Sequence, residues 1–241
     1  MIIQKLDWDT EFFGFKIGKV TIPEEGVFDW SAFKAEAKAE NYNLIYVFKT
    51  QSVLPNDILL NAHLDLVDIQ MTMSRKFEKE QYLDIEYEMR TELNPSEREQ
   101  CYYIAEETAK VSRFYKEKNI GEAKTKELYR KWIDNALNKS FSDGIFLDKR
   151  SGDVSGLHII KTDRENKTGY FTLTGVNPNY KRMGIGHYLW MQSFAYWAKE
   201  ADIEIVKSPF SLQNKESLNF HLKRGFDKIE EIKYVYHYRN I

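Results

Sequence analysis

The chain has 241 residues, of which 42% are hydrophobic and 15% aromatic, so it can bury a full core without a metal or a disulfide. Its formal net charge of -2 gives no basic field of the kind that binds nucleic acid, and any phosphate binding must therefore be local. The sequence has no apolar run near the roughly 18 residues of a membrane span, charge interrupts its start too early for a secretory signal, and the single Cys101 cannot form an internal disulfide, so a soluble protein of the reducing cytoplasm is expected.

Residues 1–78 are predicted to form a small N-terminal α/β subdomain. Within the expected helix, Trp30, Phe33 and Ala37 share one face with helical spacing. The charged stretch at 75–80 contains no Gly or Pro, which predicts a tight join to the next domain. The expected elements are, in chain order, a strand, a helix and two strands, over residues 16–22, 28–40, 43–49 and 66–74.

Residues 79–241 are predicted to form one larger α/β domain. Asn94, Pro95 and Glu97 supply a capping residue, a first-turn proline and a reciprocal glutamate for its first helix, in which Cys101 is expected in the core. The elements expected after this helix are, in chain order, a helix over 122–137, strands over 145–148, 154–161 and 169–176, a helix after residue 186, a strand over 203–209, a helix over 215–224 and a strand over 229–238.

A glycine loop links the strand over 169–176 to the next helix and is the most informative stretch of the chain. It ends in Lys181-Arg-Met-Gly-Ile-Gly186, with two glycines at the helix start. Glycines allow a ligand to approach the backbone closely, and the free N–H groups of a helix N-terminus attract an anion. The loop is therefore expected to hold a phosphate, unless its glycines serve only the close packing of helix on strand.

A second segment, Asn214-Lys-Glu-Ser-Leu-Asn-Phe-His-Leu-Lys-Arg-Gly-Phe226, begins with a helix-capping residue and ends in Gly-Phe. Together with the glycine loop it resembles motifs A and B of the GNAT acyl-CoA N-acyltransferases. In that superfamily a loop of pattern (Arg/Gln)-x-x-Gly-x-(Gly/Ala) binds the diphosphate of coenzyme A. Here Lys181 occupies the place of Arg or Gln, which matters little where backbone amides do most of the binding.

The resemblance implies a GNAT fold of class α/β (α+β), with a mixed, mostly antiparallel central sheet flanked by helices. It also implies acetyl-CoA as acyl donor and no metal. The strand before the loop is expected to offer backbone N–H groups to the thioester, while Phe171 and Leu173 alternate with Tyr170, Thr172 and Thr174 as in a central strand. The residues expected at the donor are Leu173, Thr174, Val176, Lys181, Arg182, Met183, Gly184, Ile185, Gly186, Asn214 and Ser217.

Three of the expected site residues also have a structural interpretation. Asn214 serves either as an N-cap for the N–H of Ser217 or Glu216, or as a neighbour of the pantetheine arm. His221 stands where many GNATs have a Tyr that protonates the departing thiolate, and it is either that acid or a packed core residue. His158 is a weak candidate for the base and is expected to be half exposed on its strand.

The stretches 6–20, 112–115 and 127–132 narrow the resemblance to the dTDP-fucosamine (dTDP-4-amino-4,6-dideoxygalactose) acetyltransferase branch. That branch implies acetyl transfer to the amine of a nucleotide-linked amino-dideoxy sugar. Arg113 and Tyr115 are then expected to contact the acceptor, although an arginine beside core aromatics explains the same pattern.

Two alternatives to this function stay open. One is a GNAT that acts on another small amine or a peptide N-terminus, and the other is a non-catalytic acyl-CoA-binding module. A dinucleotide site is disfavoured because the loop lacks the G-x-G-x-x-G form. The expected partners are small-molecule substrates, neither nucleic acid nor a membrane is expected, and a homodimer is left open.

Overall fold

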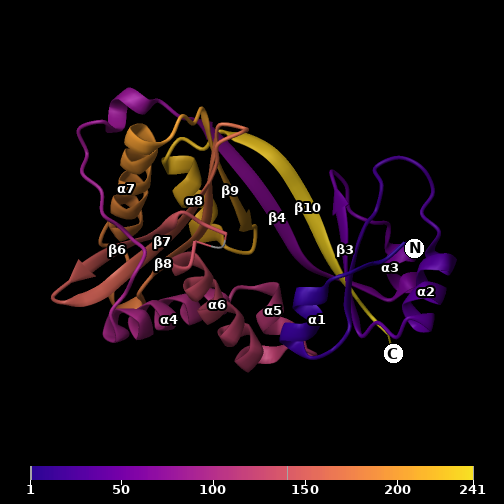
Figure 1. Cartoon of the computed structure of the whole chain (residues 1–241). Helices are drawn as coiled ribbons and strands as arrows, with labels where there is room; N and C mark the ends of the chain where they lie inside the picture. Colours follow the sequence, from indigo (N-terminus) through magenta and orange to yellow (C-terminus); the bar gives the residue numbers. More distant parts are fainter. Residues whose placement is uncertain (1, 140, 241) are drawn as a thin grey trace. The chain divides into compact units, whose positions relative to one another are not determined.

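Antiparallel pairing dominates the strands of the computed structural model, which describes residues 2–139 and 141–240 (Figure 1). Strands β2 (Ile17–Thr21) and β3 (Leu44–Thr50) are parallel, as are β8 (Thr168–Val176) and β9 (Ile205–Ser211). The predicted mixed, mostly antiparallel sheet with flanking helices is confirmed. Among the described residues, no helix combines the length and the apolar character needed to span a bilayer.

The chain divides into two compact units. The first takes the chain up to Thr72 together with Phe210–Phe220 and the stretch from Ile229 on, and the second takes Met73–Pro209 and His221–Lys228. The first unit thus includes late segments that the predicted 1–78 subdomain leaves out.

Strands of the first unit follow the order β1-β2-β3-β10-β4. Besides β2 and β3, its elements are β1 (Gln4–Lys5), α1 (Asp7–Phe13), α2 (Trp30–Ala39), α3 (Asn56–Ala62) and most of β4 (Leu64–Lys76) and β10 (Lys228–Arg239). Helix α2 begins because the Asp29 carboxylate accepts from Ala32 N–H at 2.9 Å. Its buried Phe33 meets Tyr238 of β10 edge to face, with ring centroids 5.0 Å apart. Tyr238 therefore packs between the sheet and helix α2.

Strands of the second unit follow the order β9-β8-β7-β6-β5. Besides β8 and β9, its elements are η1 (Lys79–Tyr82), β5 (Met89–Arg90), α4 (Pro95–Ala109), α5 (Arg113–Lys116), α6 (Gly121–Leu137), β6 (Gly144–Arg150), β7 (Asp153–Asp163), η2 (Pro178–Tyr180), α7 (Ile185–Glu200) and the end of α8 (Lys215–Lys223). The pairs of β5 with β6, β6 with β7 and β7 with β8 are antiparallel.

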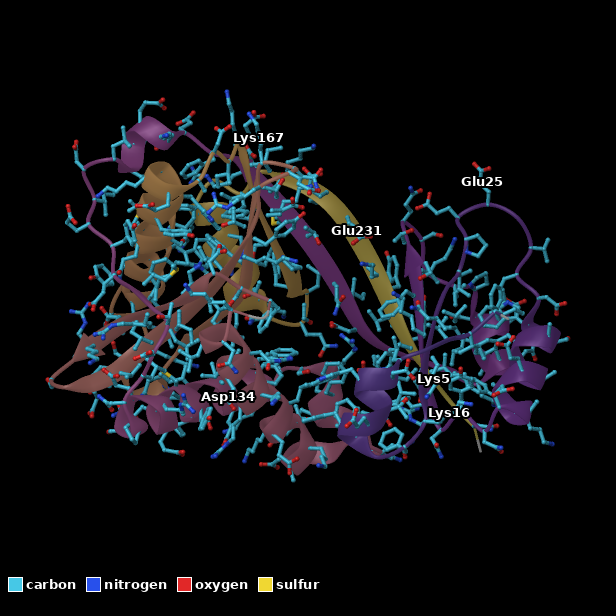
Figure 2. The ribbon with its side chains drawn as sticks, in the orientation of Figure 1. Lys5, Lys16, Glu25, Asp134, Lys167 and Glu231 are labelled. Carbon is cyan, nitrogen blue, oxygen red and sulfur yellow. The ribbon has the colours of Figure 1, made fainter. Side chains whose placement is uncertain are left out.

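Helix α4 starts at the predicted capping box. Glu97 N–H donates to the Asn94 side chain at 2.9 Å, and Asn94 N–H donates to the Glu97 carboxylate at 3.0 Å. Cys101 is buried in its core face, and burial raises the pKa of this thiol to about 12, so it serves packing. The Tyr102 hydroxyl donates to Asp134 of α6 at 2.6 Å and ties the two helices together. Asp134 is labelled in Figure 2.

Helices cover both faces of strands β6 to β8, with α4 and α6 along one face and α7 along the other (Figure 1). Two glycines set how closely these helices approach. A Cβ atom at Gly175 of β8 would lie 2.6 Å from Ile104 of α4, and one at Gly156 of β7 would lie 2.5 Å from Ile185 of α7. These contacts bring the first turn of α7 directly onto the sheet.

Candidate active site

A β-bulge interrupts β8 at Thr172. In the pairing with β7, Leu173 lies opposite Ile159 and Phe171 opposite Ile160, so Thr172 has no opposite residue. The Thr172 hydroxyl instead donates to the Ile159 carbonyl at 2.9 Å. The sequence predicts that Phe171 and Leu173 lie on the same face of the strand, and the bulge between them makes this prediction wrong. Bulges of this kind often lie beside active sites, where they redirect a strand.

The bulge places Phe171 and Thr174 on the same face of β8, although they are three residues apart. The Phe171 ring lies 4.5 Å from the Trp190 ring of α7, and Trp190 Nε1–H donates to the Thr174 hydroxyl at 3.2 Å. Gly175 faces α4 on the other side. Trp190 thus contacts residues on both sides of the bulge and fixes the path of the strand.

Strand β9 leaves β8 close to the bulge. The two strands are described in full, and their register ends at Tyr170 of β8 and Lys207 of β9. Residues 172–174 and 176 are partly exposed, whereas the paired residues Thr168 and Gly169 are buried. The end of β8 therefore has an edge that β9 does not cover.

Alternate N–H groups of β8 point toward this uncovered edge. Asn177 N–H donates to the Ser155 carbonyl of β7 at 2.9 Å. Successive peptide groups of a strand point to opposite sides, so the N–H groups of Val176 and Thr174 are directed away from β7. Of the three predicted backbone contacts, these two have the orientation that a thioester carbonyl needs, and Leu173 N–H points toward β7.

The predicted glycine loop ends at the N-terminus of α7. Gly184 is the N-cap residue, no side chain caps the helix, and Tyr188 N–H makes the first helical bond, to the Gly184 carbonyl at 3.1 Å. The N–H groups of Ile185, Gly186 and His187 precede that bond and have no helical acceptor. Together with the positive end of the helix dipole they form an anion site.

Two residues of the loop adopt left-handed backbone conformations, Arg182 with φ 63° and Gly184 with φ 78°. Glycine adopts this region without strain, whereas the same conformation costs arginine roughly 1 kcal/mol of backbone strain. The predicted Lys181, Arg182 and Met183 are exposed, so their side chains extend from the loop into solvent. Strain stored in such an exposed loop is typical of a ligand site.

His221 lies near the end of α8 and is 4% exposed, as predicted for the domain-facing side of that helix. Its Nε2 atom is 2.7 Å from the Ser208 hydroxyl of β9. Its ring meets Trp190 and Phe226 edge to face, with centroids 4.9 and 5.1 Å apart. Ser208 is the first residue of β9 beyond the register with β8, so His221 is bonded to the strand at the point where the two strands separate.

His158 of β7 is fully buried, so the expectation of a half-exposed histidine is wrong. Its Nδ1 atom lies 3.2 Å from the Leu173 carbonyl oxygen and 2.9 Å from the Thr174 hydroxyl. Burial, opposed in part by the bond to Leu173, lowers the pKa of His158 to about 3, and the ring is a poor general base. Among the described residues its Nε2 atom has no hydrogen-bond partner, which costs about 1–3 kcal/mol.

A cavity of about 400 Å³ lies beside α7. The Arg75 guanidinium donates to the Arg224 carbonyl at 2.8 Å and lies 5.2 Å over the Phe194 ring, which fixes one wall. Burial and the charge of Arg224 lower the pKa of His187. The lining residues include cations and aromatic rings and no acid, and they are Arg75, Gln81, Tyr82, His187, Trp190, Met191, Phe194, Lys223, Arg224 and Gly225.

Asn214 and Ser217 belong to the first unit, and the structure confirms their predicted capping bond. The Asn214 side chain accepts from Ser217 N–H at 3.0 Å, and Leu218 N–H donates to the Asn214 carbonyl at 3.1 Å. The remaining predicted donor residues, together with His221, belong to the second unit.

Arg113 and Tyr115 lie on α5, a single turn that starts where the Ser112 hydroxyl accepts from Phe114 N–H at 3.2 Å. The Arg113 guanidinium lies 4.2 Å from the centroid of the Phe114 ring. The Tyr115 hydroxyl bonds the Glu122 carboxylate, which raises the pKa of Tyr115. Both side chains are partly exposed and thus accessible to a ligand.

Ser208 and Trp190 are part of this arrangement and were not predicted from the sequence as site residues. Ser208 carries no local signal, because a serine in a strand is unremarkable until its partner is known. Trp190 belongs to the helix after the glycine loop, and its indole N–H becomes informative only once the bulge brings Thr174 to it. Among the described residues, no group of three or more His, Cys, Asp or Glu side chains is arranged to hold a metal ion.

Comparison with known proteins identifies the region that contains this site. Residues 110–226 match the model of the acetyltransferase (GNAT) family. No curated protein matches the sequence. Among solved structures, a functionally unknown conserved protein from Staphylococcus epidermidis aligns with a TM-score of 0.60 at 11% identity, over 94% of this chain and 85% of that one.

Two further structures share the fold at low identity. A GCN5-related N-acetyltransferase from Kribbella flavida aligns with a TM-score of 0.50 at 11% identity, over 93% of this chain and 82% of that one. A tandem GNAT protein from the clavulanic acid biosynthesis pathway aligns with a TM-score of 0.52 at 11% identity, over 87% of this chain and 68% of that one. The chain has the GNAT fold.

Proposed function

We propose that this chain, a GNAT-type N-acetyltransferase whose acetyltransferase domain includes residues 110–226, transfers acetyl from acetyl-CoA to the amine of a nucleotide-linked amino-dideoxy sugar. The observation that carries the proposal is the uncapped N-terminus of α7, which follows directly on a strand with an uncovered edge. A phosphate-binding helix start and a row of strand N–H groups in succession suit a donor that joins a diphosphate to a thioester.

The donor is proposed to bind in extended form. Its diphosphate accepts from the N–H groups at the start of α7, with Lys181 and Arg182 adding charge, and its thioester carbonyl accepts from Thr174 or Val176 N–H. The neighbouring cavity, with Arg75, Lys223 and Arg224 in its wall, suits a further phosphate of the same ligand. Asn214 and Ser217 are assigned to the pantetheine arm on the basis of the GNAT motif.

His221 is proposed to give its proton to the departing thiolate. The bond to the Ser208 hydroxyl fixes the ring, and the Trp190 and Phe226 rings exclude water around it. Direct attack needs no enzyme-bound acyl group. The amine nitrogen bonds the thioester carbon, the oxyanion forms and collapses, the C–S bond breaks, and the amine loses a proton.

The acceptor is proposed from the branch resemblance and from the chemistry of α5. Arg113 over an aromatic ring and the neighbouring Tyr115 can bind a diphosphate and stack on a base. Cys101 is a buried cysteine with a free thiol, which is compatible with the reducing cytoplasm, where we place the enzyme.

A thiol-release assay tests this function directly. Acetyl-CoA is incubated with the protein and with one of three amines: a dTDP-linked amino-dideoxy sugar, a polyamine or a peptide with a free N-terminus. Thiol release and an acetylated product with the sugar nucleotide alone support the proposal. Faster release with the polyamine or the peptide would contradict the assigned acceptor, and the absence of release with every amine would contradict the enzyme.

A further inference from the structure

The buried His158 donates a hydrogen bond to the backbone of the bulged strand β8. Its Nδ1 atom is 3.2 Å from the Leu173 carbonyl oxygen, and a carbonyl can only accept, so Nδ1 carries the hydrogen. The same atom lies 2.9 Å from the Thr174 hydroxyl. Both contacts fall on the two residues that share one peptide group.

That peptide group connects His158 to the uncovered edge of β8. The Leu173 carbonyl and the Thr174 N–H lie in one planar trans peptide and point in opposite directions. The carbonyl points toward β7 and His158, so the N–H points toward the side that β9 has left. A hydrogen bond to the carbonyl holds this plane in place and strengthens the N–H as a donor.

Trp190 holds the Thr174 hydroxyl, which is the second group that His158 contacts. Its Nε1–H donates to the Thr174 hydroxyl at 3.2 Å, and its ring lies 4.5 Å from Phe171 on the other side of the bulge. The Thr174 side chain is thus held between the imidazole and the indole. The bulge leaves Thr172 without an opposite residue, so these side-chain contacts add to the pairing of Leu173 with Ile159 in holding the peptide next to it.

The surroundings of His158 give no other reason for an imidazole at this position. The ring packs edge to face on Phe171, with centroids 4.5 Å apart, and is inclined by 29° to the Phe146 ring, with centroids 6.4 Å apart. Its Nε2 atom has no partner among the described residues, so an aliphatic side chain would fill the place without an unpaired polar atom. The Nδ1–H group is the feature that an aliphatic residue lacks.

We propose that His158 is a positioning residue that holds and polarises the Leu173–Thr174 peptide, so that Thr174 N–H donates to the oxygen of the donor thioester as it becomes an oxyanion. The inference rests on the proposed function. As the amine nitrogen bonds the carbonyl carbon, the C=O electron pair moves to the oxygen and the peptide N–H stabilises it. The pair then re-forms the carbonyl as the C–S bond breaks, the thiolate takes a proton and the amine nitrogen loses one.

Substitutions that move the donor test this role. In His158→Asn the amide reaches the place of Nδ1, whereas in His158→Gln it reaches the place of Nε2. We expect kcat to fall about 10- to 100-fold in His158→Gln and His158→Leu and to stay within about 3-fold of wild type in His158→Asn. Phe146→Leu, which removes a ring from the same cluster but no hydrogen bond, is the matched control and keeps its kcat.

A second measurement separates positioning from packing. Coenzyme A has no thioester carbonyl, so its Kd reports every donor contact except the one to Thr174 N–H and is expected to change less than 3-fold in every variant. The infrared band of acetyl-CoA labelled with ¹³C at the carbonyl is expected at lower wavenumber when bound to wild type, His158→Asn and Phe146→Leu than when bound to His158→Gln or His158→Leu. If His158→Leu does not fold, the comparison of kcat and of the carbonyl band between His158→Asn and His158→Gln still tests the role of His158.

Equal kcat and equal carbonyl bands in the Asn and Gln variants would overturn the inference, as would a band in His158→Leu at the wild-type position. The infrared measurement needs only bound donor. It therefore tests His158 even where no amino sugar is acetylated, and a failed acceptor assignment is distinguishable from a failed role of this histidine.

Discussion

The Nε2 atom of His221 lies 2.7 Å from the hydroxyl of Ser208, and this bond joins α8 to β9 where β9 separates from β8. Either partner can supply the hydrogen of this bond. Because both side chains are at most 4% exposed, the imidazole is held in one orientation inside an aromatic cluster. A proton donor to the thiolate needs such a fixed direction.

His221→Phe is expected to lower kcat about 100-fold or more, because the phenyl ring packs on Trp190 but has no proton to give. Ser208→Ala is expected to lower kcat by about 5- to 10-fold, because the imidazole remains but loses its partner. Steady-state rates with saturating acetyl-CoA measure both effects. The Kd of coenzyme A serves as control and should stay within about 3-fold, and wild-type kcat in His221→Phe would remove the acid role.

Gly184→Ala is expected to weaken coenzyme A binding at least 10-fold. The position has φ 78°, where a Cβ atom meets no neighbour but costs about 1 kcal/mol of backbone strain, and relief of that strain turns the first N–H groups of α7 away from the ligand. Gly152→Ala is the matched control, since Gly152 has φ 91° and open space in the turn between β6 and β7. Calorimetric titration compares the two, and equal Kd values would contradict the loop assignment.

Asn214→Ala is expected to lower the free energy of unfolding by about 1 kcal/mol, because Ser217 N–H loses its cap. Asn214→Asp keeps the cap and should keep the stability, measured by urea unfolding. If the amide also contacts the pantetheine arm, both variants bind coenzyme A more weakly than wild type. Wild-type affinity in both would restrict Asn214 to capping.

The stability of the protein is expected to fall in acid partly because of His158. Burial lowers the pKa of this histidine from its ordinary 6.5 to about 3, so between these values the unfolded chain binds a proton that the folded chain does not. The free energy of unfolding therefore falls as the pH falls through 6.5, and the loss levels off below pH 3. It amounts to about 2 kcal/mol at pH 5.

His158→Asn has no titrating group at this position, so its unfolding free energy should drop about 2 kcal/mol less than that of wild type between pH 8 and pH 5. Urea unfolding at the two pH values gives the comparison. Identical drops in the two proteins would mean that the folded state already accommodates the proton.

Long periodic elements and capped helix starts were predictable from the sequence because local residues determine them. The capping box at Asn94 and Glu97 and the helix after the glycine loop occur where the pattern predicts them. Helices α1, α3 and α5 were missed, since each is seven residues or fewer and too short to show a periodic apolar face.

The site was only partly predictable for a different reason. The glycine loop is one continuous segment with its own backbone signature, so its place at the start of a helix was predictable. The bulge at Thr172 depends on pairing with β7, and the partners of His158 and His221 come from other strands, so their contacts appear only with the tertiary structure.

The proposed enzyme depends on the amide groups at the start of α7 binding the diphosphate of an acyl-CoA donor. Calorimetric titration of wild type with coenzyme A and with pantetheine, which lacks the diphosphate, tests this most directly. We expect saturable heat with coenzyme A and at least 10-fold weaker binding of pantetheine, and we expect Gly184→Ala to remove most of that difference. Equal affinities for the two ligands, or no heat with coenzyme A, would contradict it.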